Sequence, residues 1–259
     1  MGFICMKKII NLMLLGSLAL SANVAFADCA ALPNFAQFKT ALTAARTASN
    51  GGFNLDMWGT VVDRDGIVCH IVFTGLTRAD QWPGSRVISA QKANTANAFS
   101  LPGLALSTAN LYSAVQPGGS LFGLQESNPV DTAAAYKGPS SAYGLYHDPL
   151  IGKKIGGVNV FGGGLPLYNS NHVLVGAIGV SGDSSCADHN IAWRTRNALT
   201  LDYVPGGVSG DPAHKDGIVY DITEQPGQLA GVSASGWGHP DCTGDATLPA
   251  IAAALPATR

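Results

Sequence analysis

Two strand–turn–strand patterns, each followed by a helical pattern, restrict the folds open to this chain more than any other feature. Residues 57–62 and 67–73 are rich in β-branched and aromatic side chains, and the Asp-Arg-Asp-Gly sequence at 63–66 has the composition of a hairpin turn. Residues 155–168 and 173–180 indicate a second hairpin in the same way. Tight turns join antiparallel neighbours, so these patterns predict an antiparallel sheet.

Helical patterns surround the hairpins. Apolar side chains recur at helical spacing in residues 33–48, residues 85–99 carry a narrow stripe of small side chains, and residues 185–199 follow a Gly-Asp-Ser sequence that suits a helix start. Ser85 is expected to cap the second of these helices. The order helix, hairpin, helices, hairpin, helix predicts an α+β fold: an antiparallel β-sheet built from two hairpins with flanking helices.

Two finer expectations concern strand faces and the C-terminal part of the chain. Because side chains alternate along a strand, Cys69 is expected to share a face with Ile71 and Phe73, and both faces of that strand are apolar enough to be covered. Residues 200–259 are expected to form an extension packed on the domain, with one strand at 218–222 and a short Ala-rich helix.

The first residues have the pattern of an export signal. Lys7 and Lys8 precede an apolar run at 9–20, and an Ala-Phe-Ala sequence at 25–27 matches a cleavage site. The apolar run is shorter than the ~20 residues that a membrane span needs, and no later segment reaches that length. We therefore expect a signal peptide at 1–27, cleavage after it, and a periplasmic or secreted protein without a membrane span.

Export determines how the cysteines are interpreted. Cys29, Cys69, Cys186 and Cys242 remain after cleavage, and an even number in an oxidising compartment favours disulfides. Three pairings are possible. We prefer a bond between Cys186 and Cys242, because it would attach the C-terminal extension to the domain.

Charge and motifs exclude several functions. Only 12% of the 259 residues are charged and the net charge is −2, so no basic field attracts nucleic acid. The Gly-x-x-Gly-x-x-Gly run at 176–182 lacks the dinucleotide-binding spacing, and the Ser-x-x-Lys match at 89–92 lacks the companion motifs of β-lactamases. Because neither a nucleophile elbow nor a zinc-binding helix motif is present, no catalytic residue is assigned.

Two histidines are candidate ligands for an iron-containing cofactor. His147 lies in an aromatic stretch beside Tyr146, and His189 lies near the start of the helix predicted at 185–199. A neutral imidazole is favoured at a helix start and can bind iron. Ordinary structural roles remain the alternative for both residues.

Three segments resemble the GlcG/HbpS family of haem-binding proteins. They are Val61-Val62-Asp63 through Gly66, the run Ser85-x-x-x-Ser89-Ala90-x-Lys92-Ala93-x-Thr95-Ala96-x-x-Phe99, and Gly163-Gly164-Leu165-Pro166-Leu167 followed by Gly176-Ala177-Ile178-Gly179-Val180-Ser181-Gly182. The resemblance covers about residues 33–199, with an insertion near 125–154. It implies a family domain at 28–199, an extension at 200–259, assembly into a homo-oligomer, and binding of haem or a related tetrapyrrole.

The resemblance does not supply an iron ligand, because the helix predicted at 33–48 contains no histidine. Lys92 and the loop that holds Gly163, Gly164 and Pro166 are expected to contact the ligand. Their alternatives are a solvated helix face for Lys92 and close backbone packing for the loop.

The sequence thus predicts an exported haem-binding protein that sequesters, senses or carries haem without turnover. An enzyme on the same fold, acting on haem or a small acid, is one alternative. An oligomeric structural or interaction module without a ligand is the other.

Overall fold

The computed structural model describes residues 28–242 and 247–259, so the predicted signal peptide lies outside the described residues. The main sheet has four antiparallel strands in the order β2-β1-β4-β3. Its strands are β1 (Trp58–Asp63), β2 (Val68–Phe73), β3 (Gly164–Tyr168) and β4 (Leu174–Ser181). The two predicted hairpins are therefore confirmed, although β3 begins only at Gly164 and not at residue 155. Their first and last strands, β1 and β4, join the hairpins into one sheet.

The longer helices are α1 (Phe35–Arg46), α2 (Ser85–Phe99) and α5 (Ser185–Ala198). The short elements are α3 (Leu124–Ser127), α4 (Thr132–Ala135), α6 (Leu248–Ala253), a hairpin of β5 (Ile222–Gln225) and β6 (Gln228–Ser233), and the 3-10 helices η1 (Cys29–Ala31), η2 (Thr108–Leu111), η3 (Ser113–Val115) and η4 (Ser140–Ala142). Two of the long helices have side-chain N-caps. Asn34 forms a capping box with Gln37 at the start of α1, and the Ser184 side chain accepts a hydrogen bond from the Ala187 amide at the start of α5. The cap predicted at Ser85 is wrong, because Ser85 already lies in the first turn of α2 and Gly84 precedes it.

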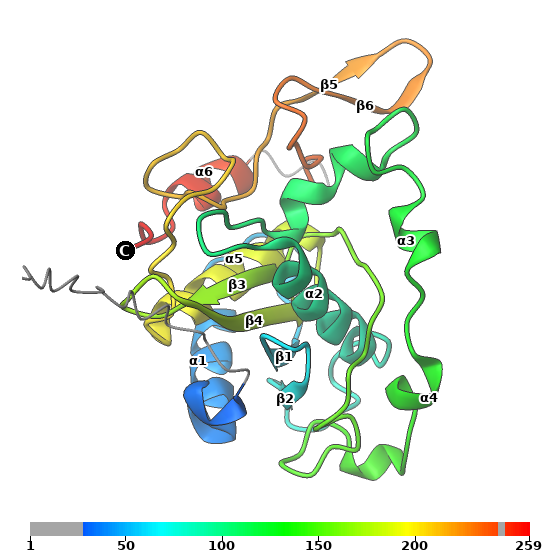
Figure 1. Ribbon diagram of the computed structural model, residues 1–259, viewed down its shortest axis with the longest axis vertical. Helices are drawn as coiled ribbons and strands as arrows, with labels where there is room; N and C mark the ends of the chain where they lie inside the picture. The colour runs from blue at the N-terminus through cyan, green and yellow to red at the C-terminus, as the bar shows by residue number, and fades with distance from the viewer. Residues whose placement is uncertain (1–27, 243–246) are drawn as a thin grey trace, which may run out of the picture.

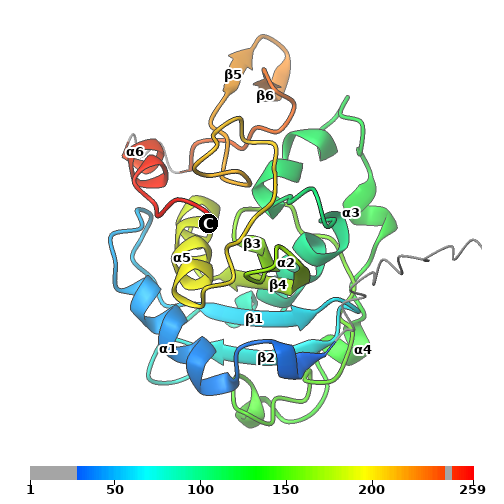
Figure 2. The same cartoon turned by 60° about the vertical axis from the view of Figure 1, so that its left-hand side comes forward.

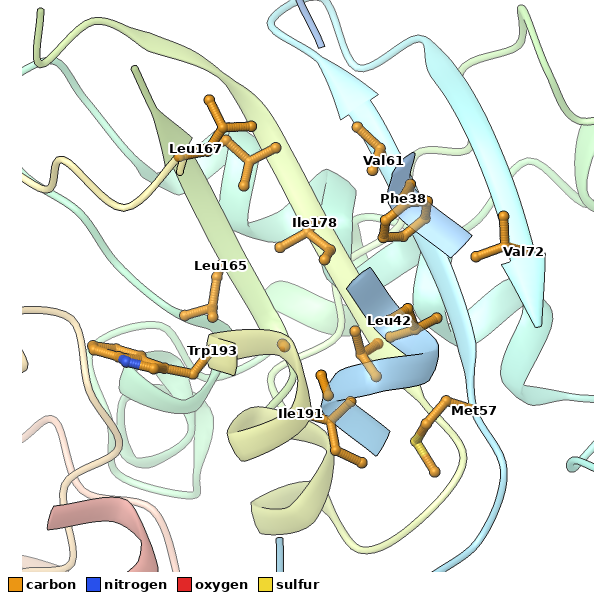
Figure 3. Packing of buried hydrophobic residues seen from close by; sticks show 14 of the residues in the cluster. Phe38, Leu42, Met57, Val61, Val72, Leu165, Leu167, Ile178, Ile191 and Trp193 are labelled. Atoms are coloured by element: carbon orange, nitrogen blue, oxygen red, sulfur yellow. The ribbon is translucent and has the colours of Figure 1, made fainter. Parts of the chain in front are cut away.

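The helices cover both faces of the sheet, as the α+β prediction requires. Helices α1 and α5 lie side by side on one face and α2 lies on the other (Figures 1 and 2). Phe38 and Leu42 of α1 and Ile191 of α5 meet the sheet in one buried cluster (Figure 3). On the opposite face α2 approaches β4 so closely that a Cβ on Gly179 would collide with the carbonyl oxygen of Ser89.

Cys69 lies on the face opposite to the one that strict alternation predicts. The register between β1 and β2 shifts here, and Cys69 is the extra residue of a β-bulge. The bulge turns its side chain toward the α1 face, where it is bonded to Cys29, whereas Ile71 and Phe73 belong to the core under α2. The expected shared face is wrong because an inserted residue breaks the alternation. Both faces of β2 are covered, as predicted.

The C-terminal tail, residues 200–259, contacts α5. Cys242 of the tail is bonded to Cys186, which is the pairing preferred from the sequence. The Trp193 indole also donates to the Pro256 carbonyl oxygen at 2.8 Å. The strand predicted at 218–222 is wrong, because most of this segment lies against α5 instead of pairing, and the strand β5 begins only at its last residue.

Across residues 28–242 and 247–259, no helix has both the length and the apolar character needed to cross a bilayer.

Candidate functional site

Lys92 of α2 forms a buried ion pair with Asp188 of α5. Its Nζ lies 2.7 Å from Asp188 Oδ2 and donates to the Val180 carbonyl oxygen at 3.2 Å, and the two side chains are 2% and 3% exposed. Burial raises the pKa of the Asp188 carboxyl to about 6, although the charge of Lys92 opposes this shift. Lys92 is therefore not on a solvated helix face: it links two helices that cover opposite faces of the sheet.

Gly163 leaves room for this ion pair at the edge of the sheet. Its φ is +118°, and an added Cβ would lie 3.0 Å from Asp188 Cβ and 3.2 Å from Lys92 Nζ. Gly164, the first residue of β3, packs equally closely against the backbone of Lys92. At these two glycines the structure shows the close backbone packing that was the alternative to ligand contact.

His189 follows Asp188 and lines a small cavity between α5 and the tail. The side chain is fully buried, and neither ring nitrogen has a hydrogen-bond partner among the described residues. The cavity has a volume of about 150 Å³, and its walls include Trp193, Ile218, Tyr220 and Ala252. The structure thus brings Lys92, Gly163, Gly164 and His189 into one region. The sequence did not predict that these four residues lie close together.

Burial keeps two histidines of this region neutral. It lowers the pKa of His189 to about 3 and that of His239 to about 4. His239 Nε2 lies 3.2 Å from the Ser185 hydroxyl, and its neighbours Cys186 and Cys242 are joined in the disulfide. These two cysteines therefore offer no thiolate that could bind a metal together with His239.

This burial predicts a loss of stability in acid. An unfolded histidine has a pKa of about 6.5, so His189 and His239 each take up a proton on unfolding below that pH. Asp188 has the opposite effect, because its raised pKa means that it releases a proton on unfolding between about pH 6 and 4. Net uptake of about one proton costs about 1.4 kcal/mol per pH unit, so about 3 kcal/mol is lost between pH 6 and 4.

Urea unfolding at pH 6, 5 and 4 measures this slope. His189→Phe removes one of the two histidines and should flatten the slope almost completely. Ile191→Val, a buried change on the same helix that removes no titrating group, should lower stability and keep the slope. An unchanged slope in His189→Phe would contradict the neutral, buried state of His189.

Tyr146 and His147 lie in a different part of the molecule. Tyr146 is 77% exposed, its ring centroid is 4.5 Å from that of His147, and His147 is also exposed. Across the described ranges no residue forms a hydrogen bond with the His147 ring. Their segment packs through Tyr143 and Leu145 on the α2 face of the sheet. Since α5 covers the other face, His147 and His189 of one chain do not approach the same point.

The surroundings of the two histidines fit haem differently. A planar macrocycle can pack on an exposed tyrosine ring while an exposed imidazole with no competing partner binds the iron, so His147 fits the group. The His189 cavity does not, because 150 Å³ is below the roughly 300–1,000 Å³ of cofactor pockets. A larger hollow of about 790 Å³ lies along α1, and in the part of the chain that the structure describes its lining is mostly Ala, Leu and Pro, with no His, Tyr, Cys or Met.

Comparison with known families assigns the domain that carries these features. Residues 34–196 match the family described as haem-degrading protein HbpS-like. The chain belongs to the HbpS-like family. The match ends at residue 196, so the tail and its side of the His189 cavity lie beyond the HbpS-like segment. No curated protein matches the chain.

Several solved structures are similar to this HbpS-like chain. One is the PduOC:heme complex, with 24% identity, a TM-score of 0.44 and coverage of 64% of this chain and 93% of that chain. Klebsiella pneumoniae protein ORFY has 27% identity, a TM-score of 0.42 and coverage of 64% and 90%. A double mutant of Streptomyces reticuli HbpS has 16% identity, a TM-score of 0.40 and coverage of 76% and 99%.

The sequence analysis identified Lys92 and His189 in this region, but not the residues next to them: Asp188, which pairs with Lys92, and Tyr220, which lines the His189 cavity. Asp188 was interpretable only as an acid in the first turn of a helix, because Lys92 precedes it by 96 residues. Tyr220 lies in the segment wrongly predicted as a paired strand, so its place in the cavity wall had no sequence signal. Pro166 is buried in β3, where its carbonyl oxygen accepts a hydrogen bond from Arg196 at 3.1 Å.

Proposed function

We propose that this protein is an exported haem-binding protein, with His147 as the iron ligand and Tyr146 beside it. The observation that carries the proposal is an exposed imidazole without a hydrogen-bond partner in the described part of the chain, next to an exposed aromatic ring, on a domain of the HbpS-like family. Bound haem would supply an iron that accepts the imidazole nitrogen.

The protein's own residues favour binding and exchange. An exposed loop can deliver a ligand to a partner without opening the core, and the buried Lys92–Asp188 pair connects α2 and α5, the helices on the two faces of the sheet. The proposal includes sequestration, sensing or transport without turnover. The family's description, haem-degrading, makes turnover the alternative.

A haemin titration followed at the Soret band tests the ligand. We expect a saturable shift at one haemin per chain. In His147→Ala we expect a loss of affinity of at least about tenfold, because losing the ligand itself should cost no less than losing a group that only supports a ligand. His172→Ala is the matched control, because His172 is also exposed but lies at a turn, with its Nδ1 held 2.9 Å from the Tyr203 carbonyl oxygen.

The same titration distinguishes the other possibilities. Equal, saturable binding by His147→Ala and the unaltered protein would reject His147 as the ligand, and a weak, non-saturating shift would reject haem binding itself. Loss of binding in a folded His189→Ala variant would move the site to the cavity. With ascorbate present, a stable Soret band supports binding without turnover, whereas its steady loss supports degradation.

Export and self-assembly are parts of the same proposal. Sequencing the N-terminus of protein secreted from an expressing cell tests cleavage after residue 27. Light scattering of the purified protein, with and without haemin, tests the homo-oligomer.

A further inference from the structure

The cavity next to His189 is built from two parts of the chain. Residues of α5 form one wall, and the tail, which lies beyond the HbpS-like segment, forms the other. Its apolar lining includes Trp193, Ile218, Pro249, Ala252 and Leu255. The cavity is therefore a feature of this chain's extension rather than of the matched domain alone.

Two buried polar groups line this cavity without protein partners. Both ring nitrogens of His189 and the hydroxyl of Tyr220 are buried, and none of them has a hydrogen-bond partner among residues 28–242 and 247–259. His214, in the same wall, is different: its nitrogens lie 2.7 Å from Asp211 Oδ2 and 2.9 Å from the Leu255 carbonyl oxygen. Since buried polar groups are almost always paired, His189 and Tyr220 mark a place for a hydrogen-bonding molecule.

The volume limits the size of that molecule. A dry cavity of about 150 Å³ lined by apolar side chains accepts benzene, so this cavity admits a single ring of about six to nine non-hydrogen atoms. The indole of Trp193 offers a flat surface for such a ring.

The charges of the walls limit its chemistry. Among the described residues, neither lysine nor arginine lines the cavity, and the only carboxylate that does, Asp211, is 48% exposed and paired with His214. Burial also raises the pKa of Tyr220 well above its ordinary value, so its hydroxyl stays neutral. An anion would meet no positive partner, and a neutral ligand is favoured.

We propose that the cavity between α5 and the tail binds a small, uncharged aromatic molecule that carries a hydroxyl group, which bonds with His189 and Tyr220. This site is separate from the haem site proposed at His147, because it lies on the other face of the sheet and is too small for a macrocycle.

Calorimetric titration of the purified protein with phenol, benzene and benzoate tests this site. Phenol should bind saturably at one per chain, benzene about three- to tenfold more weakly because it lacks the hydrogen bonds, and benzoate not measurably. Tyr220→Phe should weaken phenol binding part of the way toward the benzene level, because the bond to His189 remains, and Ala252→Leu, which fills the cavity, should abolish binding of both phenol and benzene. Tyr136→Phe is the matched control, because Tyr136 is exposed and far from the cavity wall.

Each outcome bears on the proposal. Saturable phenol binding that survives in folded Ala252→Leu, or no saturable binding by the unaltered protein, overturns it, and the second result would mean that water alone satisfies His189 and Tyr220. If Ala252→Leu does not fold, Ile218→Phe fills the cavity from the other wall and replaces it. His147→Ala should keep phenol binding whether or not it binds haemin, so failure of one site is distinguishable from failure of the other.

Discussion

Replacing Cys186 and Cys242 by alanine is expected to lower the free energy of unfolding by about 4 kcal/mol. The bond joins residues separated by 56 positions, and a cross-link over a loop of that length removes about this much conformational freedom from the unfolded chain. Cys186 lies fully buried on α5, so the loss includes a small packing change at that helix. Urea unfolding of the variant under non-reducing conditions measures it.

Removing the other disulfide distinguishes a general loss of stability from release of the tail. Cys29→Ala with Cys69→Ala opens a loop of 40 residues and should cost nearly as much stability, because the effect grows only slowly with loop length. Limited proteolysis should then cut within residues 200–242 in the Cys186/Cys242 variant alone. A tail that stays resistant in both variants, with a stability loss under about 1 kcal/mol, would show that this disulfide does not hold it.

Local patterns were sufficient for the framework of the fold. The hairpins at β1–β2 and β3–β4 and the helices α1, α2 and α5 each have a periodicity that depends only on neighbours in sequence. The α+β arrangement follows, because two apolar-faced hairpins flanked by helices have few other ways to bury those faces.

The features that the sequence analysis did not predict are those in which a residue distant in sequence determines the local structure. Cys69 changes face through a bulge that no periodicity shows. Ile218 and Tyr220 line a cavity with α5 instead of forming a strand, although the composition of their segment favours one. Lys92 was expected at a ligand or in solvent, yet it pairs with Asp188 on a helix of the opposite layer. The cavity at His189 has no sequence signal for the same reason, since its walls come from α5 and the tail.

Arg196→Met is expected to lower the free energy of unfolding by about 3–5 kcal/mol. Arg196 of α5 binds both carboxylate oxygens of Asp216 in the tail, at 2.5 and 2.8 Å, and both side chains are fully buried. Removing the cation leaves a buried carboxylate without its partner, which is the costly way to break such a pair. Urea unfolding at neutral pH gives the value.

A double variant tests whether the charge or the packing is responsible. Arg196→Met combined with Asp216→Leu removes both charges and keeps apolar volume, so it should recover most of the loss. Arg46→Met is the matched control, because its pair with Asp56 is partly exposed, at 23% and 28%, and should cost at most about 1 kcal/mol. A double variant no more stable than Arg196→Met would show that Arg196 acts through its other contacts, the Trp193 ring and the Pro166 carbonyl oxygen, instead. Because Arg196 is the last residue of the HbpS-like match and Asp216 lies beyond it, the pair links the extension to the family domain, and a single unfolding transition seen by different probes would show that the two unfold together.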